Sequence, residues 1–420
     1  MSETAGGFRA LLRSGAALAV AMAVMNVATY GYTVLVAHLV GPSDFGAFSA
    51  IMGVLLVVNV LSLGLQATGA RRISASPESV VAVERVVLGV SYRSALVLAL
   101  VLLALAPVMN AVLRLESLPT AALVALTAAP LTIMGGQAGV LQGERRWAPL
   151  SLVYLAQGVG RVAAGVGFLL VWRTEFAAVL GVAIGAWLPV VIGYVALRRP
   201  RSTTTATQVS AGELIREVAG SSQALLAFFA LSNADILLAR AVLDDHTAGL
   251  YAGGLILVKA ILFLPQFVAV IAFPSMATRG ADSSTLVKAL VVALALGLCG
   301  MGGTLLLPDL ALVFVGGEDF EEVKDLLWLF ALVGTLLSMV QLLLYSALAR
   351  QQWRAILAIW ATLVALLCSA PFVHSVEALV SLVLGLDAAL FTVLIAVAIF
   401  GRPAAPPVEE RAPESVDETR

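Results

Sequence analysis

Charged side chains stand inside several long apolar runs of the sequence, where an ion is costly and therefore indicates function. Arg161 lies near the middle of the run 150–172, and a helix of that length would place it roughly 16 Å from either end. The planar guanidinium group of arginine suits phosphate oxygens, which it can bind through two parallel hydrogen bonds. Arg161 is therefore a candidate for contact with an anionic ligand. The alternative is a structural arginine bonded to backbone carbonyls or to Gln157.

Asp235 and Lys259 form a second group of charges, in the neighbouring runs 220–242 and 250–278. Counted from the polar turn between these runs, both residues lie about 14–15 Å along their helices, so an antiparallel hairpin brings them to similar depth. An unpaired charge at that depth is costly, and we expect the two side chains to form an ion pair. The pair could exchange partners in function or remain a fixed contact, and the sequence leaves both possibilities open.

Asp387 is an isolated acid in the run 378–400, for which ion coupling and a simple helix contact are both open. Uncharged polar side chains in the runs could bind hydroxyl groups, although hydrogen bonds between helices explain most of them equally well. The candidates for ligand binding are Asn26, Asn59 and Gln66. The three histidines fall near the ends of runs, where chance explains them better than a metal site, so no metal is expected.

The amino-acid composition indicates whether these residues belong to a soluble protein or to a membrane protein. Of the 420 residues, 60% are hydrophobic and only 12% are charged, and the mean hydropathy is +1.00. Soluble domains carry about a quarter charged residues, so one core and one hydrated surface could not accommodate this chain. The sequence is that of an integral membrane protein.

A helix that crosses a membrane needs roughly 20 apolar residues. About twelve runs qualify, which predicts an all-α polytopic membrane protein with both termini on one side. The runs are 15–40, 47–70, 94–113, 120–141, 150–172, 176–197, 220–242, 250–278, 288–307, 327–348, 355–374 and 378–400.

The basic residues predict the orientation of these helices. On the side of the termini lie 19 of the 25 lysines and arginines, and three lie on the opposite side. Because cytoplasmic loops carry the excess of Lys and Arg, we expect both termini to be cytoplasmic, in the cell (cytoplasmic) membrane. The stretch LVGPSDFGAFS (39–49) then faces outward.

The chain divides near its middle into two similar halves. The sequence FGAFSA (45–50) is similar to AGLYAG (248–253), and Trp147 and Trp353 follow corresponding helices at nearly the same offset. Parallel repeats of six helices are typical of transporters that bind their substrate between the halves, although chance similarity of apolar helices is the alternative. The expected units are a six-helix lobe 1–197, a cytoplasmic linker 198–219, a second six-helix lobe 220–400 and a disordered cytoplasmic tail 401–420.

The motif GPSDFG between the first two helices has the residues of a tight turn. Pro42 fixes its own φ and restricts Gly41, whereas Gly46 can take positive φ values. Asp44 suits an N-cap of the second helix. We therefore expect a hinge at Gly41, Pro42 and Gly46. A second pair of flexing points is expected at Pro265 and Pro274, inside the eighth helix.

These segments resemble one family of membrane proteins. HLVGPSDFGAFSAI…LSLGLQATGARRIS (38–74) is similar to the first hairpin of the polysaccharide-transporter (oligosaccharide flippase) branch of the multidrug/oligosaccharidyl-lipid/polysaccharide exporter superfamily. The segments 232–277 and 315–332 are similar to the family's matching second-half region and its ninth-to-tenth connection. Together the segments cover roughly a quarter of the chain, and none is a catalytic motif.

The resemblance implies a flippase that moves a polyprenyl-diphosphate-linked oligosaccharide, or a related cell-envelope precursor, across the cytoplasmic membrane by alternating access. It also implies two lobes in a V shape around a central cavity. Arg161 would then contact the diphosphate, and Asp235, Lys259 and the candidate amides would line the path of the substrate. The implied partners are the lipid-linked oligosaccharide, the bilayer and a polysaccharide polymerase or glycosyltransferases, with no nucleic acid.

Two other functions remain as alternatives. A multidrug antiporter of the same superfamily would favour intramembrane acids in the first lobe, which has none. A membrane glycosyltransferase could bind a metal at GGEDFEEVKD (316–325), but such enzymes usually carry much longer outer loops. No G-x-x-x-x-G-K-[ST] motif occurs, so the chain itself is not expected to use ATP. We expect a transporter that is not an enzyme and needs no cofactor.

Overall fold

The computed structural model describes residues 15–75, 79–198, 210–276, 283–349 and 352–400 of the chain. Within these ranges, the side chains of residues 15–16, 221, 263–276, 283–285, 348–349 and 399–400 are not described. The secondary structure of the described residues is helical throughout, with no strand. The predicted all-α class is therefore confirmed.

The first lobe begins with a helical hairpin, two helices joined by a kink. Its helix α2 spans Gly15–Ala75, and Gly41 interrupts it with φ 76° and ψ 172°. The rings of Tyr32 and Phe48 lie 6.0 Å apart, whereas sixteen residues of straight helix would separate them by about 24 Å. The chain therefore folds back at Gly41 and crosses the membrane twice. The lobe is completed by α3 (Val80–Leu113), α4 (Leu118–Gly143), α5 (Trp147–Leu169), α6 (Glu175–Gly185) and α7 (Trp187–Leu197).

The second lobe repeats this plan with separate helices. Its elements are α8 (Ala211–Val242), α9 (Asp245–Met276), α10 (Ser283–Leu306), α11 (Pro308–Val315), η2 (Glu318–Leu326), α12 (Leu327–Ala349), α13 (Trp353–Cys368), η3 (Ala370–Phe372) and α14 (Val376–Phe400). Nine stretches of the described residues are long and apolar enough to cross a membrane, with α6 and α7 joined as one. Because α2 folds back on itself, it supplies two membrane crossings instead of one. Adding α9 and the shorter α13 brings the number of crossings to the predicted twelve.

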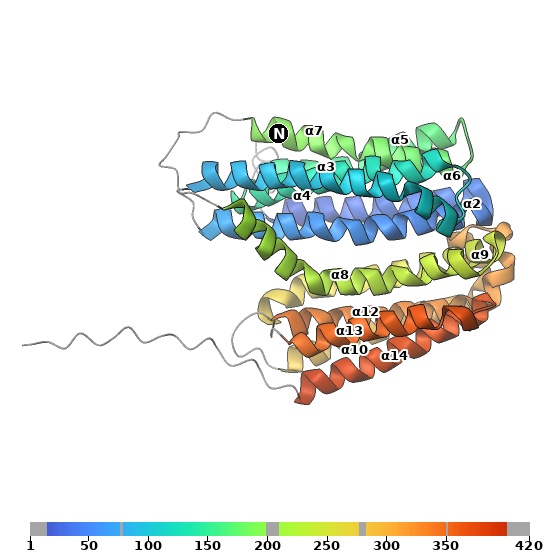
Figure 1. The fold of residues 1–420 in the computed structure, drawn as a ribbon. Coiled ribbons are helices and arrows are strands. Elements are labelled where there is room, and N and C mark those ends of the chain that lie inside the picture. The colour runs from blue at the N-terminus through green and yellow to red at the C-terminus, as the bar shows by residue number, and fades with distance from the viewer. Residues whose placement is uncertain (1–14, 76–78, 199–209, 277–282, 350–351, 401–420) are drawn as a thin grey trace, which may run out of the picture.

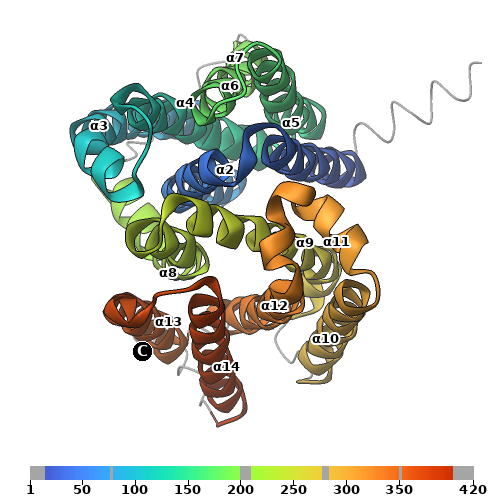
Figure 2. The ribbon, with the colours of Figure 1, turned by 90° about the vertical axis from the view of Figure 1, so that its right-hand side faces the viewer.

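The two lobes meet along α2 of the first and α8 and α9 of the second (Figures 1 and 2). Glycines of α2 allow a close approach: a Cβ atom added to Gly53 would lie 3.2 Å from Ile236, and one added to Gly64 would meet Ser222. The first turns of α8 lie within the segment 198–219 predicted as a linker. The tail 401–420 lies outside the described residues.

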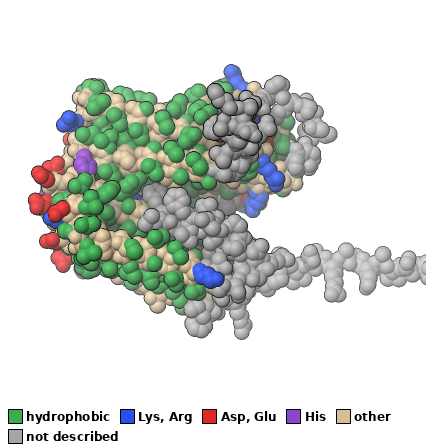
Figure 3. All heavy atoms as spheres, turned by 180° about the vertical axis from the view of Figure 1, so that it is seen from behind, with side chains coloured by type: hydrophobic (Ala, Val, Ile, Leu, Met, Phe, Trp, Pro, Cys, Tyr) green, Lys and Arg blue, Asp and Glu red, His purple; other side chains and the backbone are tan. Residues whose placement is uncertain are grey.

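The two ends of the molecule differ in charge. We call one end the corner end, where the turn at Gly41–Gly46 and the turn at Asp244–Gly249 lie. The opposite basic end carries Arg71, Arg72, Arg145 and Arg198. Figure 3 shows acidic side chains gathered at one end of the molecule and most of the visible lysines and arginines toward the other.

Candidate functional site

The corner turns of the two lobes pack backbone against backbone. A Cβ atom added to Gly249 would lie 2.0 Å from the carbonyl oxygen of Pro42, and one added to Gly46 would lie 3.0 Å from the Gly249 Cα. The positive φ lies at Gly41 rather than at Gly46, so Gly46 serves this close approach instead of the turn itself. The predicted hinge residues Gly41, Pro42 and Gly46 thus lie where the lobes touch.

Asp44 caps a neighbouring helix and not its own, contrary to the sequence-based expectation. Its Oδ2 accepts a hydrogen bond from the backbone N–H of Glu175, 3.2 Å away, at the start of α6. The Glu175 carboxylate in turn accepts one from the backbone N–H of Glu116 at 2.9 Å. In the second lobe, Asp244 accepts from the backbone N–H of Thr247 at 3.0 Å. Hydrogen bonding from the side chain and the backbone of Thr247 lowers the pKa of Asp244. Carboxylates therefore fix both corners.

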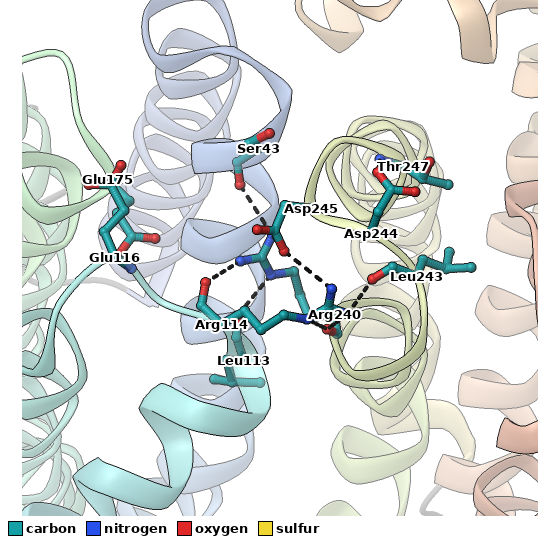
Figure 4. A network of polar contacts seen from close by, with 10 residues as sticks. All are labelled: Ser43, Leu113, Arg114, Glu116, Glu175, Arg240, Leu243, Asp244, Asp245 and Thr247. Carbon is teal, nitrogen blue, oxygen red and sulfur yellow. Dashed lines mark hydrogen bonds and ion pairs between the residues drawn. The ribbon is translucent and has the colours of Figure 1, made fainter.

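Arg240 is a deeply buried cation at the corner end, near the last turn of α8. Its side chain is 2% exposed. Its Nε donates to the carbonyl of Leu113 at 2.9 Å and its Nη2 to that of Arg114 at 2.6 Å (Figure 4). Its Nη1 lies 3.4 Å from the carbonyl of Ser43. All three acceptors belong to the first lobe.

Arg114 makes the corresponding hydrogen bonds in the opposite direction, from the first lobe to carbonyls of the second. It follows α3 in the left-handed region, with φ 48°, and its Nε donates to the carbonyl of Arg240 at 3.0 Å. Its Nη2 donates to the carbonyls of Arg240, at 2.5 Å, and Leu243 (Figure 4). The carboxylate of Asp245 lies 3.5 Å from Arg114 and 3.3 Å from Arg240. We call Arg114, Arg240 and Asp245 the arginine clasp.

The predicted ion pair between Asp235 and Lys259 does not form in the structure. No ion pair joins these two described residues, although each influences the other electrostatically. Lys259 Nζ donates to Asn233 Oδ1 at 2.8 Å and lies 3.3 Å from the carbonyl of Ser232. Asp235 accepts a hydrogen bond from the Tyr251 hydroxyl at 3.0 Å. The predicted equal depth is consistent with this proximity, but the rotation of the helices gives each charge a different partner.

Asp387 is not isolated, in contrast to its place in the sequence. It is 3% exposed, and with Asp235, which is 5% exposed, it lines a cavity of about 10 Å³ inside the second lobe. A volume of this size holds roughly one water molecule. The two carboxyl groups interact electrostatically, and Ser232 also lines the cavity. The second lobe therefore contains two buried acids near one partly buried amine.

Arg161 lies in α5 of the first lobe, about 12 Å along the helix from Leu169. Its side chain is partly buried, and no hydrogen bond or ion pair reaches it from the described residues, Gln157 included. It interacts electrostatically with Tyr32, whose hydroxyl donates to the carbonyl of Ala178 at 2.8 Å. The alternative of a structural arginine held by carbonyls or by Gln157 therefore finds no support among the described residues.

Gln66 belongs to a small network that faces the same side of α5. It donates to Gln142 and to Tyr154, both at 2.8 Å. Tyr154 stands one heptad before Arg161, so both side chains project from one face of the helix. The Oδ1 atom of Asn59 is buried without a partner among the described residues. Asn26 is partly buried in α2.

The remaining predicted positions divide into two groups. Pro265 and Pro274 lie in α9, but their side chains are outside the described residues. The acidic segment 316–325 contains most of η2, and the ring of its Phe320 lies 5.9 Å from the ring of Phe45 at the corner. No cluster of described His, Cys, Asp or Glu side chains could hold a metal ion. The acidic segment thus packs against the corner.

A family model described as "Polysaccharide biosynthesis protein" matches residues 11–279, which is more than half of the chain. The chain belongs to this family. The resemblance to the polysaccharide-transporter branch of the exporter superfamily is therefore confirmed. No curated protein sequence matches the chain.

Solved structures of transporters share the fold of this family member. The lipid II flippase MurJ, in an inward closed conformation, has a TM-score of 0.70 at 11% identity, over 91% of this chain and 87% of the flippase. An inward-facing multidrug resistance transporter of the MATE family has a TM-score of 0.69 at 14% identity, over 90% of this chain and 94% of the transporter. The MATE transporter DinF-BH, in complex with R6G, has a TM-score of 0.63 at 15% identity, with 94% and 96% covered. The two-lobed transporter fold is thus common to all of them.

Proposed function

We propose that this protein is a flippase that moves a lipid-linked, polyprenyl-diphosphate oligosaccharide or a related cell-envelope precursor across the cytoplasmic membrane by alternating access. The observation that carries the proposal is Arg161, a cation within the membrane span that has no partner among the described residues. Its family and the fold of the lipid II flippase support a phosphate-bearing lipid as substrate. A glycosyltransferase would supply this substrate, and a polymerase would consume it.

The physical reason is the balance of charge along the substrate's path. A diphosphate carries negative charge into a medium that disfavours ions, and a cation at depth offsets that penalty. An unpaired arginine is itself costly there, so the bound diphosphate and Arg161 stabilise one another. Gln66 and Tyr154, on the same side of α5, are hydrogen-bonded to each other and would exchange that bond for bonds to the sugar.

Replacement of Arg161 tests this proposal. We expect Arg161→Ala to lower polymer export about tenfold or more, since a hydrogen bond to a charged group is lost, and Arg161→Lys to be impaired because a point charge lacks the planar fork. Export is measured in cells that depend on the variant, together with the protein level. Arg173→Ala, an exposed arginine between α5 and α6, is the matched control. Normal export by Arg161→Ala would refute the contact, and a change confined to drug resistance would favour the multidrug antiporter.

The conformation of the molecule fits one half of an alternating-access cycle. Its lobes are joined at the corner end by the arginine clasp and by the contact between Pro42 and Gly249. The fold is more similar to the inward-facing MATE transporter, with a TM-score of 0.69, than to an outward-facing one, with 0.57. These observations support an inward-facing state in which the corner end is the closed outer side.

Cysteine labelling tests the orientation. Because the basic end carries most of the lysines and arginines, we expect cysteines at Ser43 and Thr247 to react with an impermeant thiol reagent in intact cells. Cysteines at Ser202 and Ser415 should react only after lysis. Reaction of Ser202→Cys in intact cells would reverse the orientation, and with it the direction of transport.

We further propose that Asp387, together with Asp235, couples transport to an ion. Two carboxyl groups beside one cavity leave a negative charge that Lys259 alone does not neutralise. A proton or a small cation in the cavity would supply the missing charge. This proposal is independent of which sugar the substrate carries.

A further inference from the structure

We infer that the arginine clasp is a latch: Arg114 and Arg240 hold the corner end closed, and their bonds must break before that end can open. The inference rests on the proposed function only because it assumes that the two lobes move apart. It assigns a gating role to two residues that contact neither the predicted substrate path nor the buried acids.

The clasp is built from reciprocal caps on helix ends. The last carbonyls of a helix have no partner within it and accept bonds from other groups. Arg240, near the end of α8, donates to carbonyls at the end of α3, and Arg114, just after α3, donates to carbonyls at the end of α8. Each arginine thus satisfies the helix end of the opposite lobe. Because every one of these bonds crosses from lobe to lobe, separation breaks them together.

The clasp lies far along α8 from the turns that attach this helix to the first lobe. The first turns of α8 remain attached to the first lobe, where Leu214 and Val218 pack in a cluster with Leu65 and Ile73. Glu217 also binds Arg72 at 2.7 Å. Arg240 lies about 33 Å further along the helix than Val218. A rotation about the attached end therefore moves the corner end furthest, and a contact there opposes it most effectively.

Backbone carbonyls, more than the ion pairs with Asp245, hold the latch. Asp245 is half exposed, and ion pairs of exposed groups contribute little. Arg240 is 2% exposed and reaches several carbonyls through its planar fork. Lysine cannot reproduce this geometry. The inference therefore predicts that Arg240→Lys opens the latch and that Asp245→Asn leaves it nearly intact.

The experiment measures how readily the seam between the lobes opens. Ala248 is fully buried beside Gly46 of the opposite lobe, and Ala138 is fully buried within the first lobe. Each is changed to Cys in the full chain, with Cys299 and Cys368 replaced by Ala, and the purified protein in nanodiscs is treated with a hydrophilic maleimide. Both ends are accessible in a nanodisc, so the result does not depend on the orientation.

We expect Arg240→Ala and Arg240→Lys to raise the labelling rate at Ala248→Cys about tenfold. This factor corresponds to the loss of one hydrogen bond to a charged group. The labelling rate at Ala138→Cys should not change. Arg114→Gly should act likewise, because glycine keeps the left-handed backbone at this position and removes only the side chain. Arg173→Ala and Asp245→Asn are the controls that should change neither rate.

Two outcomes would overturn the latch. Unchanged labelling of Ala248→Cys in all the arginine variants would show that the clasp does not keep the lobes together. Equal increases at Ala248→Cys and Ala138→Cys would show that the arginines stabilise the fold as a whole. Neither readout involves a substrate, so failure of the flippase proposal through Arg161 would be recognised separately.

Discussion

Gly249→Ala is expected to force the two corner turns apart and to destabilise the closed molecule by about 1–3 kcal/mol, the range found when a packed contact is overfilled. The added Cβ atom would lie 2.0 Å from the carbonyl oxygen of Pro42. This neighbour is backbone at a proline, so it cannot rotate away as a flexible side chain would. The destabilisation is measured by thermal melting in detergent, together with the labelling of Ala248→Cys.

Other glycines provide a graded series of controls for this prediction. The contact at Gly46 is milder, since its Cβ atom would lie 3.0 Å from Gly249, and Gly46→Ala should have a smaller effect. Gly302 has no atom within 4 Å of an added Cβ, so Gly302→Ala should be tolerated. A melting temperature for Gly249→Ala equal to that of Gly302→Ala would show that the corners are not closely packed in the membrane.

The helices could be predicted because the membrane imposes a length. Runs of about 20 apolar residues are visible in the sequence without knowledge of their partners. The turn at Gly41–Pro42 was also recognisable, because its backbone requirements are local. The role of Gly46 was not, since it depends on Gly249, which lies two hundred residues away in the other lobe. Local chemistry predicts a turn but not what packs against it.

The arginine clasp illustrates the same limit. Arg114 and Arg240 are separated by 126 residues, and in the sequence each is simply a basic residue near a helix end. Arginine near a helix C-terminus was the available signal, because free carbonyls there attract cations. The signal does not say whether the carbonyls belong to the residue's own helix. Only the structure shows that they belong to the other lobe.

The depth of the intramembrane charges could be estimated by counting residues from the helix ends. The direction in which each side chain points could not be predicted from the sequence. Arg161 was identified by the penalty of burying a cation, and the structure leaves it without a partner among the described residues. Asp235 and Lys259 were expected to pair, yet Asp235 accepts from Tyr251 and Lys259 donates to Asn233. A helix rotated by one residue turns a side chain through about 100°, which is enough to exchange one partner for another.

The buried charges of the second lobe should have unequal effects on stability. Lys259→Met is expected to be the most damaging single change, on the order of a few kcal/mol, because it leaves two acids without a nearby cation. Asp235→Asn should be milder, roughly 1–3 kcal/mol, since it weakens the bond from Tyr251 but retains an amide oxygen. Asp387→Asn should leave the melting temperature equal or higher, because it removes a buried acid for which no hydrogen bond is found among the described residues.

The substitutions should rank differently by their effect on transport than by their effect on stability. This difference distinguishes a role in ion coupling from a purely structural role. If the cavity between Asp235 and Asp387 holds the proton or cation that drives transport, Asp387→Asn keeps the fold but removes one carboxylate that the ion needs. Flipping in proteoliposomes should then no longer respond to an imposed proton or sodium gradient, whereas flipping by the wild-type protein should respond.

The double variant Asp235→Asn with Lys259→Met should recover part of the stability lost by Lys259→Met, because one acid and the amine are removed together. A gradient response that survives Asp387→Asn would place the coupling ion elsewhere, and strictly additive losses in the double variant would mean that the amine does not offset these acids.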